Sequence, residues 1–239
     1  MLRIALVGQK GGAGKSTLCW ALANAALARS NGEKVLLVET DPQGSTAAYV
    51  EKALARYPGL DRRLTCAALY TTEDLATILD EANEQGFDFV IIDTQGAHDD
   101  LPKNIMAIAD RTLIPVRAVQ HEYESQLATL TVYERLKDAF ASDGEEIGPG
   151  GLLLNDFKAS ERLNLEQAAA FDLIQGNPKT LSFYMPRRNG YQTLGSGKIL
   201  ILERDALTAA TDKIKRSAVE GDIAAAEAVL QAIEAMGHG

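Results

Sequence analysis

The sequence predicts an α/β protein in which helices cover both faces of a mostly parallel sheet, as a single doubly wound domain. Two observations lead to this fold class. Short apolar runs alternate along the chain with longer stretches that have helical periodicity. A glycine-rich segment directly follows the first apolar run and precedes a helical stretch, which is the arrangement of a phosphate-binding loop. At 239 residues, 46% of them hydrophobic, the chain can bury a substantial core.

The expected elements follow from the two periodicities. Runs rich in leucine and β-branched residues are typical of strands buried on both faces, and they predict strands at 3–7, 34–39, 87–93, 111–116, 151–155 and 181–185. Apolar residues at three- and four-residue spacing predict helices at 15–31, 45–55, 72–85, 125–142, 164–175 and 205–236, the last with a possible break near Gly221. Because no repeat or linker interrupts this pattern, we expect one domain over residues 1–239.

Charge and cysteine content narrow the classes of function. The chain has 33 acidic and 24 basic residues, so its net charge of −9 repels polyanions, and any contact with nucleic acid needs a local basic patch. The two cysteines are too few for a disulfide framework or a metal cluster, which indicates a reducing compartment. The four apolar residues before Gly8 are too few for a signal-peptide core or a membrane span. These features predict a cytoplasmic protein.

The glycine-rich segment at 8–17 has the composition of a phosphate cradle. Its glycines allow a tight turn that points successive N–H groups at phosphate oxygens, and the following helix adds its positive end. Lys15 supplies a charge for the β- and γ-phosphates, and the Ser16 hydroxyl is a candidate ligand of Mg²⁺. The strict motif fails only at its first glycine, where this chain has Gln9. The predicted nucleotide contacts are Gly11, Gly12, Ala13, Gly14, Lys15, Ser16 and Thr17.

Residues 10–17 resemble the deviant Walker A box of the ParA/MinD family of ATPases, in which a second lysine precedes the glycines. The sequence Gln9-Lys10-Gly11-Gly12 favours the ParA branch. The resemblance implies a homodimer that encloses two ATP molecules, with Lys10 as a catalytic residue that reaches the phosphates of the partner. A lysine at the outer edge of the loop would otherwise crowd the charge of Lys15.

Two further segments resemble the acidic motifs of that family. In the segment 36–44, Asp41 matches the carboxylate that orients the attacking water and holds the outer shell of the metal; a helix cap or turn residue before Pro42 is the alternative. Glu39 stands where relatives have aspartate, so a role for it in the metal shell stays open. The strand at 87–93 ends in Asp93, which is how a Walker B carboxylate reaches Mg²⁺, and the loop after it is closer to the VirC-type branch.

The remaining candidates concern the base and the DNA. Asn155 ends a predicted strand, where it either contacts adenine or makes a turn. The tail at 220–236 is acidic and without basic residues, so no membrane partner is expected. Six basic residues either form a strip that contacts DNA phosphates or are separate surface charges in solvent. They are Arg187, Arg188, Lys198, Lys213, Lys215 and Arg216.

The resemblance therefore implies a switch ATPase that uses ATP and Mg²⁺. Its ATP-bound dimer would bind nonspecific double-stranded DNA of the nucleoid, position or partition a cargo, and be reset by hydrolysis that a cargo adaptor stimulates. An ATP-dependent ligase for small molecules and a non-hydrolysing scaffold are the alternatives. The nucleotide loop alone does not decide among them, because one fold supports many functions.

Overall fold

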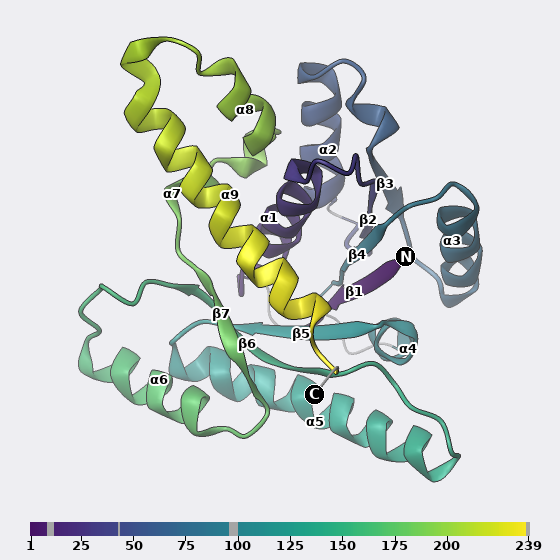
Figure 1. The fold of residues 1–239 in the computed structure, drawn as a ribbon. Helices are drawn as coiled ribbons and strands as arrows, with labels where there is room; N and C mark the ends of the chain where they lie inside the picture. Colours follow the sequence, from purple (N-terminus) through teal and green to yellow (C-terminus); the bar gives the residue numbers. More distant parts are fainter. Residues whose placement is uncertain (9–11, 43, 96–99, 238–239) are drawn as a thin grey trace.

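The computed structural model describes residues 1–8, 12–42, 44–95 and 100–237. In these ranges, seven parallel strands form one sheet in the order β3-β2-β4-β1-β5-β6-β7 (Figure 1). Strand β1 lies at the centre, with β2, β3 and β4 on one side of it and β5, β6 and β7 on the other, so the direction in which strands are added reverses at β1. The strands are β1 (Leu2–Leu6), β2 (Val35–Glu39), β3 (Leu64–Ala68), β4 (Phe89–Asp93), β5 (Arg111–Val116), β6 (Gly150–Phe157) and β7 (Thr180–Pro186).

Helices cover both faces of this sheet. One hydrophobic cluster holds residues of α1 (Lys15–Ala28), α2 (Ser45–Arg56), α7 (Asn189–Gln192), α8 (Leu200–Ala206) and α9 (Lys213–Glu234). The other holds residues of α3 (Thr72–Glu84), α4 (Asp100–Ile108), α5 (Gln120–Ser142) and α6 (Leu165–Gly176). Short 3₁₀ turns occur at Leu60–Arg62, Leu194–Ser196 and Ala210–Asp212.

The strands alternate their side chains between these two clusters. In β1, Ile4 packs into the first cluster and Ala5 into the second, and in β2 Leu37 and Val38 divide in the same way. All four are fully buried. A strand that is buried on both faces reads as a continuous apolar run, so its sequence pattern is easy to detect. The predicted doubly wound fold class is confirmed.

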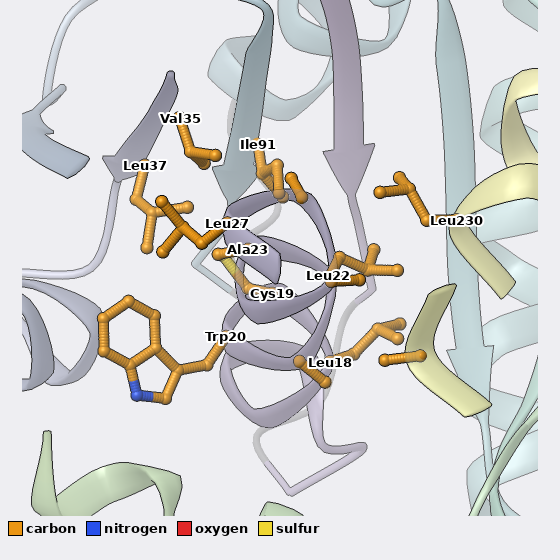
Figure 2. Packing of buried hydrophobic residues seen from close by; sticks show 14 of the residues in the cluster. Leu18, Cys19, Trp20, Leu22, Ala23, Leu27, Val35, Leu37, Ile91 and Leu230 are labelled. Atoms are coloured by element: carbon orange, nitrogen blue, oxygen red, sulfur yellow. The ribbon is translucent and has the colours of Figure 1, made fainter. Parts of the chain in front are cut away.

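Helix α1 is buried almost along its whole length. It packs against β2, β4 and α9, with Leu18, Trp20 and Leu22 pointing outward in different directions into the apolar core (Figure 2). Two polar side chains of α1 are paired with the chain that packs against it: Trp20 Nε1 donates to the Leu194 carbonyl at 2.7 Å, and Asn24 Oδ1 accepts from the Leu200 N–H at 2.7 Å. Because α1 begins at the phosphate loop, this packing fixes one end of that loop.

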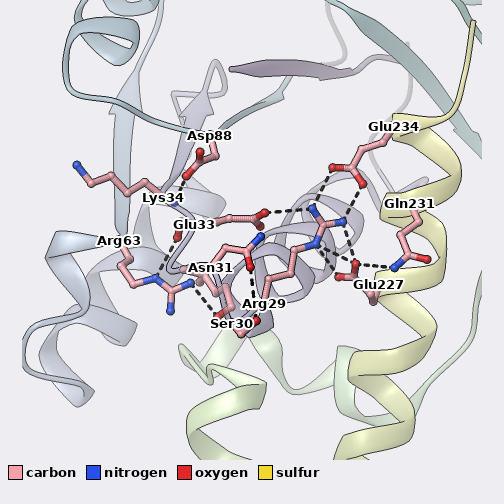
Figure 3. A network of polar contacts seen from close by, with 11 residues as sticks. Arg29, Ser30, Asn31, Glu33, Lys34, Arg63, Asp88, Glu227, Gln231 and Glu234 are labelled. Carbon is pink, nitrogen blue, oxygen red and sulfur yellow. Dashed lines mark hydrogen bonds and ion pairs between the residues drawn. The ribbon is translucent and has the colours of Figure 1, made fainter. Parts of the chain in front are cut away.

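An ion-pair network joins the far end of α1 to α9. Arg29 directly follows α1, and its guanidinium lies 2.8 Å from carboxylate oxygens of both Glu227 and Glu234 and 3.3 Å from Glu33 (Figure 3). The Arg29 side chain is only 17% exposed. Largely buried charges of this kind depend on each other for compensation. The network therefore holds α9 alongside the helix that carries the phosphate loop.

The structure contains a strand and a helix that the sequence did not predict. Strand β3 was not predicted; it is an edge strand that pairs only with β2 among the described residues, and the exposed polar residue Thr65 interrupts its apolar run. Helix α4 was also missed. Pro102 lies in its first turn, where the missing N–H of proline costs no helical hydrogen bond.

The C-terminal prediction was wrong in its bounds. Instead of one helix from residue 205, α8 ends at Ala206 and α9 begins at Lys213. No break occurs at Gly221, and α9 continues to Glu234. An interior glycine costs a helix roughly 1 kcal/mol. The buried side chains of Val229 and Leu230 hold α9 in the first cluster, and this packing offsets that cost.

Candidate nucleotide-binding site

The phosphate loop joins β1 to α1 at the carboxyl edge of the sheet. Strand β1 has β4 on one side and β5 on the other, so the loop opens where the strand order reverses, which is the usual ligand crevice of such sheets. Gly12 and Gly14 have φ angles of 99° and 79°, in the region that favours glycine. A Cβ at Gly14 would also lie 2.7 Å from Asn155 Nδ2. Lys10 and Gly11 lie outside the described residues.

A pocket of about 360 Å³ brings together the predicted phosphate and metal residues from three separate segments. The loop and the start of α1 form one wall, the end of β2 a second, and the end of β4 a third. Its lining residues are Gly12, Gly14, Lys15, Ser16, Thr17, Glu39, Asp41, Asp93 and Thr94. A triphosphate and a hard divalent cation need such a combination of cationic, hydroxyl and carboxylate groups.

Lys15 is buried, with 8% of its surface exposed, and its Nζ donates to the Gly8 carbonyl at 3.4 Å. Burial lowers the pKa of Lys15, while the nearby charges of Asp93 and Asp41 oppose that shift. The ammonium is thus held in a pocket that disfavours its charge. A phosphate group would supply the compensating negative charge.

Asp93 is anchored by hydroxyl groups of α1 and α2. Thr46 Oγ1 donates to Asp93 Oδ2 at 2.7 Å, and Ser45 Oγ donates to Ser16 Oγ at 3.2 Å. Burial raises the pKa of the Asp93 carboxyl, whereas hydrogen bonds from Ser16 and Thr46 and the charge of Lys15 oppose the rise. The first turn of α2 therefore connects the phosphate loop with the end of β4.

Glu39 has a different set of contacts. Its Oε1 accepts the Asp41 N–H at 3.0 Å and its Oε2 accepts the Thr46 N–H at 2.8 Å, with only 1% of its surface exposed. Burial raises the pKa of the Glu39 carboxyl, and these two hydrogen bonds act against the rise. The extra methylene relative to aspartate lets one carboxylate hold the turn at Asp41 and the N-terminus of α2 together.

We expect Glu39→Gln to lower the free energy of unfolding by about 2 kcal/mol, because the amide presents one acceptor and turns a donor toward a backbone N–H. Urea unfolding measures this loss. Glu51→Gln, at an exposed position on α2, is the matched control and should change stability by less than about 0.5 kcal/mol. Equal stability of the two variants would contradict the role of Glu39.

A second pocket, of about 230 Å³, opens on the other side of the loop. Asn155 lies in its wall with 5% exposure, and its Nδ2 donates to the Ala13 carbonyl at 2.8 Å. The next residue, Asp156, has a φ of 54° and an ion pair with Arg187 at 3.1 Å. The pocket is lined by Gly12, Gly14, Thr17, Leu18, Arg117, Asn155, Asp156, Met185, Pro186, Arg188, Tyr191 and Gln192. Asn155 thus supports the phosphate loop and at the same time borders a cavity that adjoins it.

Comparison with known proteins agrees with this geometry. The family model described as VirC1 protein matches residues 1–236. The chain belongs to the VirC1 protein family. It is 30% identical to protein virC1 of Rhizobium rhizogenes over 172 residues, which cover 71% of this chain and 70% of that protein. This confirms the resemblance to the ParA/MinD ATPases with a VirC-type character.

Two further similarities extend beyond the VirC1 proteins. The chain is 32% identical to the chromosome-partitioning ATPase Soj of Thermus thermophilus over 157 residues, which are 56% of this chain and 62% of Soj, so the match spans less than two thirds of that relative. The fold is similar to that of the MinD cell division protein of Aquifex aeolicus, with a TM-score of 0.60 at 18% identity over 97% of this chain and 98% of that one.

In this VirC1-family chain, the six residues of the predicted basic strip fall on separate elements. Arg187 pairs with Asp156 and, at 2.7 Å, with Glu161, while Arg188 lies 4.0 Å from Asp222 and borders the second pocket. Lys213, Lys215 and Arg216 are exposed in the first turn of α9, where Arg216 pairs with Glu220 at 3.1 Å, and Lys198 is half-buried ahead of α8. The first turn of α9 is therefore the part of the predicted strip with the most exposed cations.

Sequence reasoning missed several residues at the site. Ser45 and Thr46 follow directly after the predicted acidic motif, and two hydroxyl residues at the start of a helix were the available signal. Arg117 follows β5, forms an ion pair with the buried Glu122, and borders the second pocket. Nothing in the local sequence distinguishes Arg117 from a surface charge.

None of the helices in the described part of this chain is both long and apolar enough to cross a bilayer.

Proposed function

We propose that this chain is an ATP-hydrolysing switch that positions or partitions a cargo. The observation that carries the proposal is the convergence of Lys15, Ser16, Asp41 and Asp93 in one pocket beside the phosphate loop. The name of the related Soj, a chromosome-partitioning ATPase, supports a partitioning role.

The residues of the pocket divide into roles that match phosphoryl transfer, in which a protein mainly positions groups and stabilises charge. Lys15 neutralises the β- and γ-phosphates, and the N-terminus of α1 adds backbone N–H groups. Ser16 and Asp93 would hold Mg²⁺, since hydroxyl and carboxylate oxygens are the ligands that this ion prefers. A bound Mg²⁺ would neutralise charge that develops on the phosphate oxygens. Asp41 orients the attacking water.

The dimer, the base and the DNA complete the proposal. Two protomers meet face to face across ATP, with Lys10 of each reaching the phosphates held by the other. Asn155 borders the pocket where the base would lie. Its hydrogen bond to the Ala13 carbonyl fixes the position of the phosphate loop relative to that pocket. The exposed cations at the start of α9 contact DNA phosphates. Because α9 packs along α1, the nucleotide loop and these cations belong to one packed unit.

Sedimentation with ATP and Mg²⁺, with ADP and without nucleotide, each with and without random-sequence duplex DNA, tests the proposal. We expect dimerisation and DNA binding only with ATP, and an affinity that falls steeply with salt. A chain that stays monomeric or ignores DNA in every nucleotide state would contradict it. Binding of ATP without turnover would instead favour a scaffold.

Replacing the three cations at the start of α9 by glutamine should weaken DNA binding and reduce the slope of log K against log salt. The slope should fall by about three per protomer, since each phosphate contact contributes roughly 0.9. The variant carries Lys213→Gln, Lys215→Gln and Arg216→Gln, and binding is measured by fluorescence anisotropy over a salt series.

The matched control removes exposed cations from other elements, as Arg135→Gln, Lys137→Gln and Lys158→Gln. It has the same net charge as the α9 variant, so a nonspecific charge effect would appear in both. Equal salt slopes for the two variants would show that the first turn of α9 is not the DNA surface.

A further inference from the structure

Gln126, on α5, is fully buried against the residue at which the phosphate loop begins. A Cβ built on Gly8 would lie 2.7 Å from Gln126 Oε1 and 2.9 Å from Gln126 Nε2. The side-chain amide therefore lies directly against the Cα of Gly8, at a distance that only glycine permits. Gln126 does not belong to the motifs that the sequence analysis assigned.

The amide of Gln126 is incompletely paired. Its Oε1 accepts a hydrogen bond from Thr129 Oγ1 at 3.4 Å, and its Nε2 has no partner within the described ranges. A hydroxyl can both donate and accept, so the amide turned the other way would leave its oxygen unpaired instead. Buried polar groups are nearly always paired, because an unpaired one loses its hydration without compensation. An unpaired amide beside the nucleotide loop is available to a partner that another state of the site brings into place.

Gly8 also has a backbone carbonyl that accepts hydrogen bonds. Lys15 Nζ donates to the Gly8 carbonyl at 3.4 Å. When the ammonium of Lys15 turns to the phosphates of a bound nucleotide, its bond to the Gly8 carbonyl is lost. Gln126 Nε2 is a donor that already lies against Gly8.

We propose that Gln126 is a positioning residue of the phosphate loop, which donates its amide N–H to the Gly8 carbonyl when Lys15 moves to the nucleotide. The inference rests on the proposed function only in requiring that the pocket binds a nucleoside triphosphate. The exchange keeps the end of β1 fixed while the lysine changes partners. Part of the nucleotide affinity then comes from pairing a donor that is unpaired beforehand.

Gln126→Leu tests this exchange, because leucine is similar in size but can neither donate nor accept. Without nucleotide, we expect the melting temperature of the variant to lie close to that of the wild type, because removal of the unpaired Nε2 offsets the lost acceptor of Thr129. Its dissociation constant for ATP with Mg²⁺, from isothermal titration calorimetry, should rise about tenfold. Gln126→Met gives the same comparison with an unbranched side chain if the leucine variant does not fold.

Thr112→Val is the matched control. Thr112 Oγ1 is also buried and without a hydrogen-bond partner among the described residues, but Thr112 lies within β5 and lines neither nucleotide pocket. It should leave the dissociation constant for ATP unchanged. A structural role alone would lower the melting temperature of the Gln126 variants without nucleotide and leave the affinity intact.

The outcomes separate this inference from the proposed function. Wild-type chain that binds no nucleotide overturns both. Wild-type chain that binds ATP, together with Gln126 variants whose affinity stays within twofold of it, overturns the inference alone. Weaker binding by the Gln126 variants, with unchanged binding by Thr112→Val and no loss of stability without nucleotide, supports it.

Discussion

Lys15→Met should weaken ATP binding by at least about 100-fold, or roughly 2.7 kcal/mol. Methionine keeps the length and the apolar stem of the lysine, so the change removes chiefly the ammonium. That ammonium is buried beside the loop, where few water molecules screen its attraction for a phosphate. Titration calorimetry with ATP and Mg²⁺ measures the loss.

Lys179→Met is the matched control for this prediction. Lys179 is a half-exposed lysine that pairs with Glu134, away from both pockets, and an exposed pair of this kind contributes little. Its ATP affinity should equal that of the wild type. An affinity of Lys15→Met within threefold of the control would mean that the pocket does not hold the phosphates.

The second large effect is expected for Asp93→Asn, which should reduce ATP turnover about 100-fold, equivalent to roughly 2.7 kcal/mol of activation free energy. Asparagine has the shape of aspartate and can still accept the hydrogen bond of Thr46, which spans 2.7 Å. It carries no negative charge for a divalent cation. The variant should therefore bind ATP in EDTA as the wild type does, and gain much less affinity when Mg²⁺ is added.

Asp88→Asn controls for the substitution itself. Asp88 directly precedes β4, at the edge of the sheet opposite to Asp93, and accepts the Lys34 N–H at 2.8 Å. Turnover and the effect of Mg²⁺ should be unchanged in this variant. If Asp93→Asn hydrolyses ATP at the rate of the Asp88 variant, Asp93 is not part of the metal site.

The fold was accessible from the sequence because its central strands are buried on both faces. The runs that became β1, β2, β4 and β5 are short and mostly apolar, and the stretches after β1, β2 and β5 have apolar residues at three- and four-residue spacing. Edge strand β3 was not predicted because its solvent-exposed side carries polar residues such as Thr65. Helix α4 was not predicted because Pro102 is taken as a helix breaker from the local sequence, although the first turn of a helix accepts proline.

The site divides in the same way between local and distant information. Residues 12–17 of the phosphate loop are consecutive, so their spacing alone specifies a turn with N–H groups, a lysine and a hydroxyl. The roles of Lys10 and Asp41 stay predictions, and Lys10 lies outside the described residues. The two oxygens of Glu39 could not be assigned from sequence, since their partners are backbone groups on the following turn and helix.

By itself, the sequence determined the fold class and predicted the kind of ligand, because each depends on patterns within a few consecutive residues. The tertiary structure decided which distant side chains complete the site. Thr46 reaches Asp93 across 47 positions and Asn155 reaches Ala13 across 142, while Gln126 lies against Gly8. Parallel strands bring their carboxyl ends to one edge through long crossovers, so residues that meet there have no fixed spacing along the chain.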